Sequence, residues 1–150
     1  MRKGLTLVEI LLAVTIVVIV AAIGLNAANP SGQLGKARNN ERQLHLEAIM
    51  NSIRENIVDA NIGAFSCASG LLPTSSPLVM ASASGSYDIA PCLVPIYLPV
   101  MPFDPVTSTA HWGGMSDYNT GYTIVQNAST GVITIAAPAA ELNKSISISR

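Results

Sequence analysis

The acidic side chain Glu9 is the residue in this sequence whose surroundings most constrain its chemistry. It is the one charge in the apolar stretch from Leu5 to Leu25, which contains no Lys, Arg or Asp. An ionised carboxylate costs about 2.5–3.5 kcal/mol at the centre of a bilayer and less toward the interface. A buried carboxylate becomes tolerable when an opposite charge pairs with it. Glu9 is therefore a candidate for ion pairing, and extension of its side chain to the membrane interface is the alternative.

The two cysteines, Cys67 and Cys92, form a second pair of residues with a defined chemistry. Outside the membrane the compartment is usually oxidising, so the pair predicts a disulfide that closes a loop of about 25 residues and stabilises the fold by about 2–4 kcal/mol. Two buried free thiols are the alternative. Metal binding is not expected, because the sequence has no further Cys and no close His.

Three oxygen-bearing side chains, Asp104, Asp117 and Asn119, fall in a turn-rich stretch over 102–121. Carboxylate and amide oxygens are ligands that calcium prefers. However, the regular spacing of a calcium-binding loop is absent, and Asp and Asn in loops are more often turn formers. We therefore predict no metal site.

Catalytic signatures are missing from the chain. It has no G-x-S-x-G, no H-E-x-x-H, no P-loop and no dinucleotide fingerprint, and its two histidines, His45 and His111, are far apart. The sequence predicts a protein that is not an enzyme and needs no cofactor; a meeting of Asp104, His111 and a serine in space is the alternative. The net charge of −1 and the lack of a basic patch give no support to nucleic-acid binding.

The apolar stretch is long enough to cross a membrane. Its 21 residues, at about 1.5 Å per helical residue, span a hydrocarbon core of roughly 30 Å. Arg2 and Lys3 precede it, so the positive-inside rule places the C-terminal part outside. A cleavable signal peptide is the alternative, since Ala22-Ile23-Gly24 resembles its small-x-small cleavage site.

The segment GLTLVE at 4–9 resembles the processing site of type IV prepilins and type II secretion pseudopilins. In that family a dedicated peptidase cuts after the glycine, here Gly4, and a glutamate stands fifth in the mature chain, here Glu9. Leu5 departs from the more common Phe but keeps the apolar residue whose α-amine is methylated. The resemblance covers the first 25 residues closely and the plan of the rest loosely.

The resemblance implies how such a chain would be processed and stored. Residues 1–4 would be the leader, 5–29 the hydrophobic transmembrane and filament-core helix, and 30–150 the globular domain. Cutting after Gly4 would free an α-ammonium on Leu5, and in a filament Glu9 would pair with that group on an adjacent subunit. The implied partners are other copies of the chain, a prepilin peptidase, assembly machinery of the inner membrane, and the cytoplasmic membrane before assembly.

A second helix is predicted beyond the span. Gly24, Pro30, Gly32 and Gly35 favour a kink or local melting over 24–35. Helical periodicity then returns over 33–60, where apolar residues at spacings of three and four form one stripe, consisting of Leu46, Ile49, Met50, Ile53 and Ile57. The other faces are expected to carry the charges, consisting of Lys36, Arg38, Glu41, Arg42, Glu47, Arg54, Glu55 and Asp59.

The rest of the chain predicts a loop region over 64–120 and antiparallel strands over 121–150. Short strands such as Ile96 to Leu98 are the most that the loop region should hold, because prolines at 91, 95 and 99 exclude a central strand. GYTIVQ and VITIAA flank the turn NASTG, and SISISR alternates strictly. The fold class is α+β, with the order of the type IV pilin fold: a long N-terminal helix packed on a small C-terminal antiparallel sheet.

These features favour a structural subunit, a pilin that polymerises into a surface filament. A pseudopilin of a type II secretion or DNA-uptake system is the first alternative, and a secreted globular binding domain released by signal peptidase is the second. The long Ser- and Pro-rich loop with its cysteine pair favours the pilin.

Overall fold

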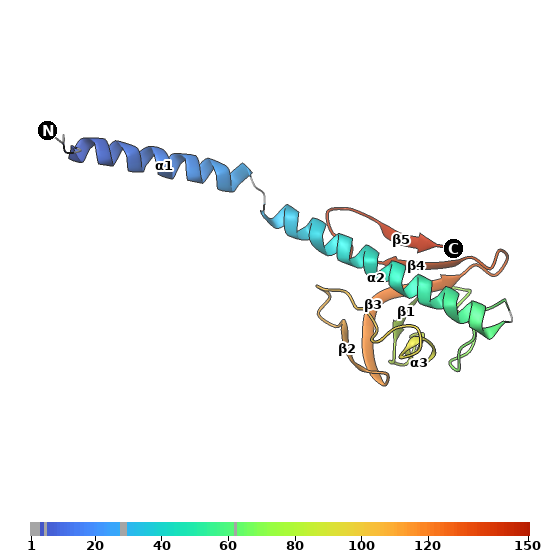
Figure 1. The fold of residues 1–150 in the computed structure, drawn as a ribbon. Coiled ribbons are helices and arrows are strands. Elements are labelled where there is room, and N and C mark those ends of the chain that lie inside the picture. Colours follow the sequence, from blue (N-terminus) through green and yellow to red (C-terminus); the bar gives the residue numbers. More distant parts are fainter. Residues whose placement is uncertain (1–3, 5, 28–29, 62) are drawn as a thin grey trace. The chain divides into compact units, whose positions relative to one another are not determined.

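A computed structural model of the chain describes residues 4, 6–27, 30–61 and 63–150. Its helices and strands occur in an order that confirms the predicted α+β class (Figure 1), consisting of α1 (Leu7–Ala27), α2 (Pro30–Ala60), β1 (Leu78–Ala81), α3 (Ala90–Leu93), β2 (His111–Gly114), β3 (Asp117–Gln126), β4 (Ile133–Ala137) and β5 (Ile146–Ser149). The chain divides into two compact units, Met1–Gly35 and Lys36–Arg150.

The predicted break between 24 and 35 coincides with the junction of the two long helices. α1 ends at Ala27 and α2 begins at Pro30, while residues 28–29 lie outside the described residues. Proline suits the first position of a helix, where its missing N–H would have no partner in any case. Gly32 and Gly35 lie within α2, so the structure shows no melting at either glycine.

The apolar stripe predicted for α2 is confirmed. Leu46, Ile49 and Ile53 have no exposed surface, and Met50 is also buried. One prediction about this helix is wrong: Arg42, expected on the charged side, is fully buried. The reason is geometric, because Arg42 precedes Leu46 by four residues and so lies on the same face of the helix.

The C-terminal unit contains a five-stranded antiparallel sheet in the order β1-β3-β4-β5, with β2 also paired to β3. Asn119 in β3 is aligned with Ala81 of β1 and with His111 of β2, so these two strands lie on opposite edges of β3. The three strands predicted over 121–150 are present as β3, β4 and β5, and β3 begins four residues earlier, at Asp117.

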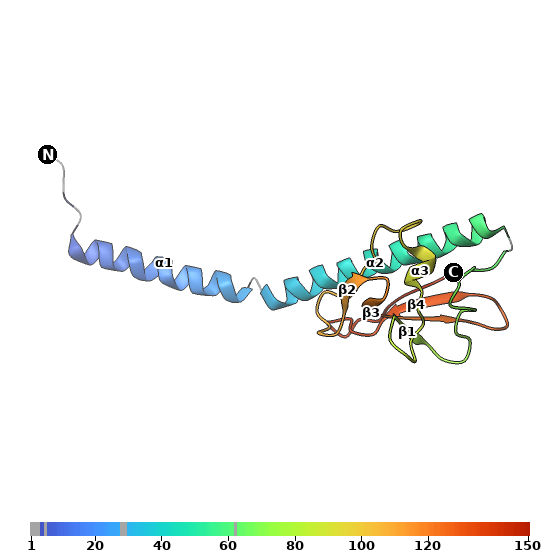
Figure 2. The same cartoon turned by 90° about the horizontal axis from the view of Figure 1, so that it is seen from below.

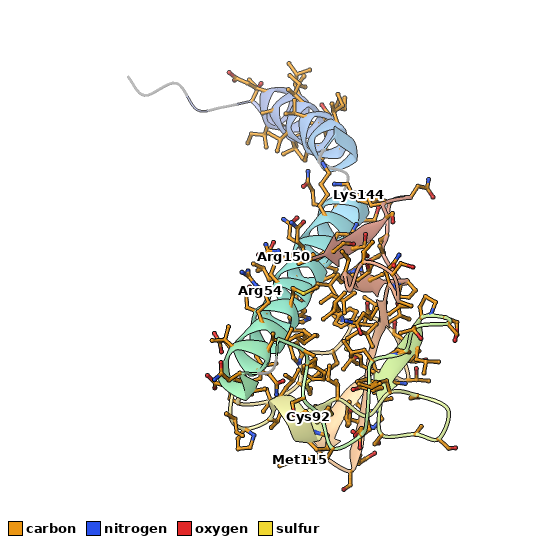
Figure 3. The ribbon with its side chains drawn as sticks, turned by 90° about the vertical axis from the view of Figure 1, so that its right-hand side faces the viewer. Arg54, Cys92, Met115, Lys144 and Arg150 are labelled. Carbon is orange, nitrogen blue, oxygen red and sulfur yellow. A yellow bond between two sulfur atoms is a disulfide. The ribbon has the colours of Figure 1, made fainter. Side chains whose placement is uncertain are left out.

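The core lies between α2 and one face of this sheet. Figure 1 and Figure 2 show α2 running along the sheet, and Figure 3 shows side chains filling the space between them. Alternate residues of the central strands point into it, including Tyr122, Ile124 and Ile135, all without exposed surface. Ile146 and Ile148 of β5 pack against the same core, as their alternation with serine predicted.

The region 64–120 is more ordered than the sequence predicted, since it contains β1, α3 and β2. The sequence allowed at most short strands such as Ile96 to Leu98, and no strand forms at these residues. Pro91 stands in the first turn of α3, and the carbonyl of Leu93 then accepts hydrogen bonds from the N–H groups of Tyr97 and Leu98. These bonds close a turn, which leaves the segment unable to pair as a strand.

Candidate functional site

Helix α1 presents apolar side chains on every side. All the described side chains of Leu7–Gly24 are exposed, including Leu7 at 79% and Ile10 at 53% of their surface. By length and composition this stretch is able to cross a membrane, although an N-terminal signal sequence has the same properties. Exposed apolar surface of this extent is stabilised when a membrane or another protein covers it.

The first turn of α1 positions Glu9. The N–H of Glu9 donates to the carbonyl of Thr6 at 3.1 Å and approaches the Thr6 hydroxyl oxygen at 3.3 Å. Thr6 thus caps the helix, and its spacing from Glu9 is that of a capping box. A carboxylate in the first turn also interacts favourably with the helix dipole. This local role was not predicted from the sequence, although the T-x-x-E pattern of Thr6 and Glu9 is typical of a capping box.

Glu9 and Thr15 are the only polar side chains described in Leu7–Gly24. The hydroxyl of Thr15 donates to the carbonyl of Leu12 at 2.8 Å, so it is satisfied inside the helix. No side-chain partner of the Glu9 carboxylate is found among the described residues. The predicted processing bond lies just before this helix: Gly4 is exposed, and Leu5 lies outside the described residues.

The predicted disulfide joins Cys67 to Cys92, with their Cα atoms 5.2 Å apart. Asn56 of α2 fastens the same loop to the helix. Its side-chain oxygen accepts the N–H of Ser66 at 2.9 Å, and its amide nitrogen donates to the carbonyls of Ser66 and Cys92 at 3.1 and 3.4 Å. The bond and the amide together hold the 64–93 segment against α2.

A buried charge cluster lies at the N-terminal half of α2. The guanidinium of Arg42 donates to Asp104 at 2.7 and 3.3 Å and to Glu141 at 2.9 Å. Arg38 forms a bidentate salt bridge with the same Glu141, in which two guanidinium nitrogens donate to the two carboxylate oxygens at 2.7 and 2.6 Å. The side chains of Arg42 and Asp104 have no exposed surface, whereas that of Glu141 is 29% exposed. The helix, the loop before β2 and the segment before β5 are thus joined through one guanidinium.

The protonation of these carboxyls follows from the cluster. Burial alone would raise the pKa of Asp104, but the Arg42 guanidinium and the N–H groups of Val106 and Thr107 lower it to about 2. Hydrogen bonds from Arg38 and Arg42 likewise lower the pKa of Glu141 to about 2. Both acids are therefore ionised at neutral pH, as a structural ion pair requires.

The three oxygen ligands considered for calcium do not meet. Asp104 faces Arg42, the Asn119 side chain accepts the N–H of Gly121, and Asp117 lies 3.0 Å from a ring nitrogen of His111. In the described part of the chain, no group of three or more His, Cys, Asp or Glu side chains could hold a metal ion.

The two histidines lie in different surroundings. His45 is half-buried on α2, where its ring nitrogen lies 2.9 Å from the hydroxyl of Tyr122 and burial lowers its pKa. His111 is exposed at the start of β2, and its contact with Asp117 raises its pKa. Its carboxylate partner is therefore Asp117 rather than the Asp104 considered from the sequence.

No family model, curated protein or solved structure matches this chain. Its function must therefore be argued from its own residues. Glu141, the shared partner of Arg38 and Arg42, was not predicted from the sequence. No local pattern marks that residue, because its partners lie about 100 positions earlier in the chain.

Proposed function

We propose that this protein is a filament subunit of the type IV pilin kind, stored in the cytoplasmic membrane and polymerised through its N-terminal helix into a surface fibre. One observation carries the proposal: α1 is apolar on all sides, unburied in the described chain, and holds a single carboxylate in its first turn. A membrane covers such a helix before assembly, and helices of neighbouring copies cover it afterwards.

Glu9 has two roles in this proposal. Within one copy it stabilises the first turn of α1, beside the cap from Thr6. Between copies it pairs with the α-ammonium that cleavage after Gly4 would create on Leu5. Pairing removes the penalty of an isolated charge among apolar side chains and fixes the axial register of the subunits.

The C-terminal unit supports the same proposal through its plan. A long helix packs on an antiparallel sheet, and a disulfide holds the connecting segment, which is the order of elements in the pilin fold. This segment is Ser- and Pro-rich and holds the cysteine pair, which favours a pilin over a pseudopilin. The proposed role is structural rather than catalytic.

The N-terminal residue of the mature chain recovered from cells tests the proposal directly. Intact mass and N-terminal sequencing should find a chain that begins at Leu5, with or without a methyl group. A chain that begins near Leu25 would instead identify a secreted domain released by signal peptidase and would refute the filament proposal.

Substitution of Glu9 tests the assembly role. Glu9→Ala should leave the chain in the membrane but abolish fibres in sheared surface material viewed by electron microscopy. Thr15→Val is the matched control, because it changes the other polar side chain of the span without altering its charge. Fibres from Glu9→Ala at the yield of the unaltered chain would mean that the carboxylate merely extends to the interface.

A further inference from the structure

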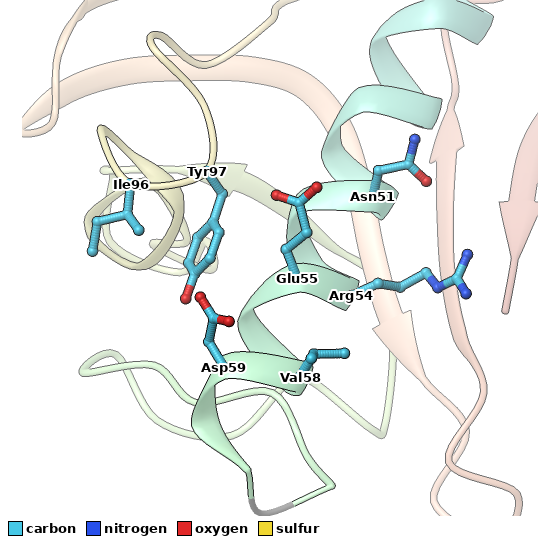
Figure 4. A pocket seen from close by; sticks show the side chains of 7 residues that line it. All are labelled: Asn51, Arg54, Glu55, Val58, Asp59, Ile96 and Tyr97. Carbon is cyan, nitrogen blue, oxygen red and sulfur yellow. The ribbon is translucent and has the colours of Figure 1, made fainter.

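A groove of about 630 Å³ lies between the C-terminal half of α2 and the turn after α3. Figure 4 shows the Tyr97 hydroxyl and the Asp59 carboxylate pointing toward one another, with the Glu55 carboxylate on the same side of the helix and Arg54 directed away. Asp59 accepts a hydrogen bond from Tyr97 and contributes to the raised pKa of that phenol, after the larger contribution of burial. The groove therefore has two carboxylates on its floor and one aromatic wall.

These carboxylates lack a cation. Among the described residues, neither Glu55 nor Asp59 forms an ion pair. The rim beside them is apolar, with Ile96 and Val58 each 74% exposed. Apolar walls lower the local dielectric and strengthen the attraction of a carboxylate for an incoming positive charge. The groove thus suits a side chain with an apolar stem and a cationic end, as lysine has.

Two lysines lie at the opposite end of the same helix. Lys144 lines a second groove, of about 220 Å³, with Asn39, Asn40 and Gln43 of α2 (Figure 3). Lys36 stands one helical turn before Asn40, on the same face. Within the described chain neither lysine has an ion-pair partner. Leu142, 47% exposed, supplies apolar surface two residues before Lys144.

One copy cannot bring these two ends together. Gln43 and Glu55 are separated by about 18 Å along a rigid helix, at about 1.5 Å per residue, and Lys36 is farther still. Only a second copy of the chain can place its lysines in the groove. We propose that the lysine-bearing end of one C-terminal unit, with Lys36 and Lys144, docks into the Glu55–Asp59 groove of the next.

Such a contact joins two different surfaces, so each docked pair leaves one free groove and one free lysine-bearing end. A head-to-tail contact of this kind continues without closing unless its rotation happens to form a ring. The inference rests on the proposed function in that its partner is a second copy, and it adds a contact between C-terminal units to the one between N-terminal helices.

Zero-length cross-linking in membranes from cells tests the contact without requiring fibres. Full-length chains are labelled with light or heavy nitrogen in separate cultures. Their membranes are mixed, fused and treated with a carbodiimide that joins touching amines and carboxylates. Mass spectrometry should find peptides that link Lys36 or Lys144 of one isotope to Glu55 or Asp59 of the other. Glu47, on the same helix outside the groove, is the internal control and should give at least about tenfold fewer links.

Charge exchange gives the second readout. Reversing both groove acids (Glu55→Lys with Asp59→Lys) should lower the yield of assembled material about tenfold, and reversing both lysines as well (Lys36→Glu with Lys144→Glu) should restore it. Glu47→Lys is the matched control and should leave the yield unchanged.

The two proposals fail in different ways. Absence of groove links between isotopes, or unchanged assembly after reversal of the groove acids, overturns the docking contact and leaves the filament proposal standing. A mature chain that begins near Leu25 overturns the filament proposal. The same cross-linking is then done on the released chain, where links between isotopes would still establish the docking contact and their absence would overturn it.

Discussion

The buried pair of Arg42 and Asp104 gives the sharpest test of how the C-terminal unit is held together. Asp104→Asn keeps the shape of the side chain and an oxygen that can still accept the N–H groups of Val106 and Thr107. It removes the negative charge 2.7 Å from the Arg42 guanidinium, which has no exposed surface. Loss of one partner of a buried pair costs about 3–5 kcal/mol of unfolding free energy. Since Glu141 continues to accept from Arg42, we expect about 3 kcal/mol.

The assay is urea unfolding of the disulfide-intact, full-length chain in detergent. The single tryptophan, Trp112, reports on the unit, because its ring packs 5.6 Å from that of Tyr118. With an m-value of about 2 kcal/mol/M, the midpoint should fall by about 1.5 M. Adding Arg42→Met removes the stranded charge, so the double variant should be more stable than Asp104→Asn alone.

The same pair predicts a dependence on pH. The Asp104 carboxyl has a pKa of about 2 in the folded chain against an ordinary value of 3.8. Its contribution is therefore complete above about pH 4 and is lost as the pH falls toward 2, and Asp104→Asn should lack this loss. A single Asp104→Asn variant that unfolds within about 0.5 kcal/mol of the unaltered chain would refute the argument that the buried charge needs its partner.

Three further results are expected. Replacing Cys67 and Cys92 by serine should lower the free energy of unfolding by about 2–4 kcal/mol in the same urea assay, and an unchanged midpoint would contradict the loop-closure argument. Gly121→Ala should cost more than about 1 kcal/mol, because Gly121 has a φ of +72° and an added Cβ would lie 3.1 Å from a neighbouring Cβ. The pKa of His111, measured by NMR, should lie above the ordinary value of 6.5 and return toward that value in Asp117→Asn. The stabilising contact between His111 and Asp117 is therefore present below the raised pKa and is lost as the pH rises through it.

Local periodicity predicted the elements whose burial repeats along the sequence. The spacing of Leu46, Ile49 and Ile53 predicted the buried face of α2, and the alternation of Ile146 and Ile148 predicted the inward face of β5. In both cases neighbours in the sequence carry the signal, because the hydrophobic effect acts on each residue of the face in the same way.

Residues that depend on distant partners were harder to predict. Arg42 lies on the buried face, but its charge led to its placement on the solvent side, and only the carboxylates of Asp104 and Glu141 make its burial tolerable. Strand β1 likewise depends on β3, with Leu78 aligned to Ile124 across about 46 residues of chain. Sequence patterns carry no record of such pairings.

Two features of the candidate site were predictable from the sequence. One is the cysteine pair, which forms a disulfide in the structure, and the other is the position of Glu9 near the start of an apolar helix. The groove at Glu55 and Asp59 could not be predicted from the sequence, because it forms only when the turn after α3 packs beside α2. From the sequence alone, these two acids resemble any other solvated side chains on the outer face of a helix.

The separation in sequence of the partners of Arg42 has a consequence for the rate at which the unit opens. Its carboxylates come from positions 62 and 99 residues later in the chain, so they reach the guanidinium only after α2, β3 and β4 are in place. Loop closure costs entropy before such a contact forms, so we expect these contacts to be absent from the transition state for folding. Interactions that are absent from the transition state slow unfolding and leave the folding rate nearly unchanged. The cluster should therefore slow the unfolding of the C-terminal unit and prolong the lifetime of its folded state.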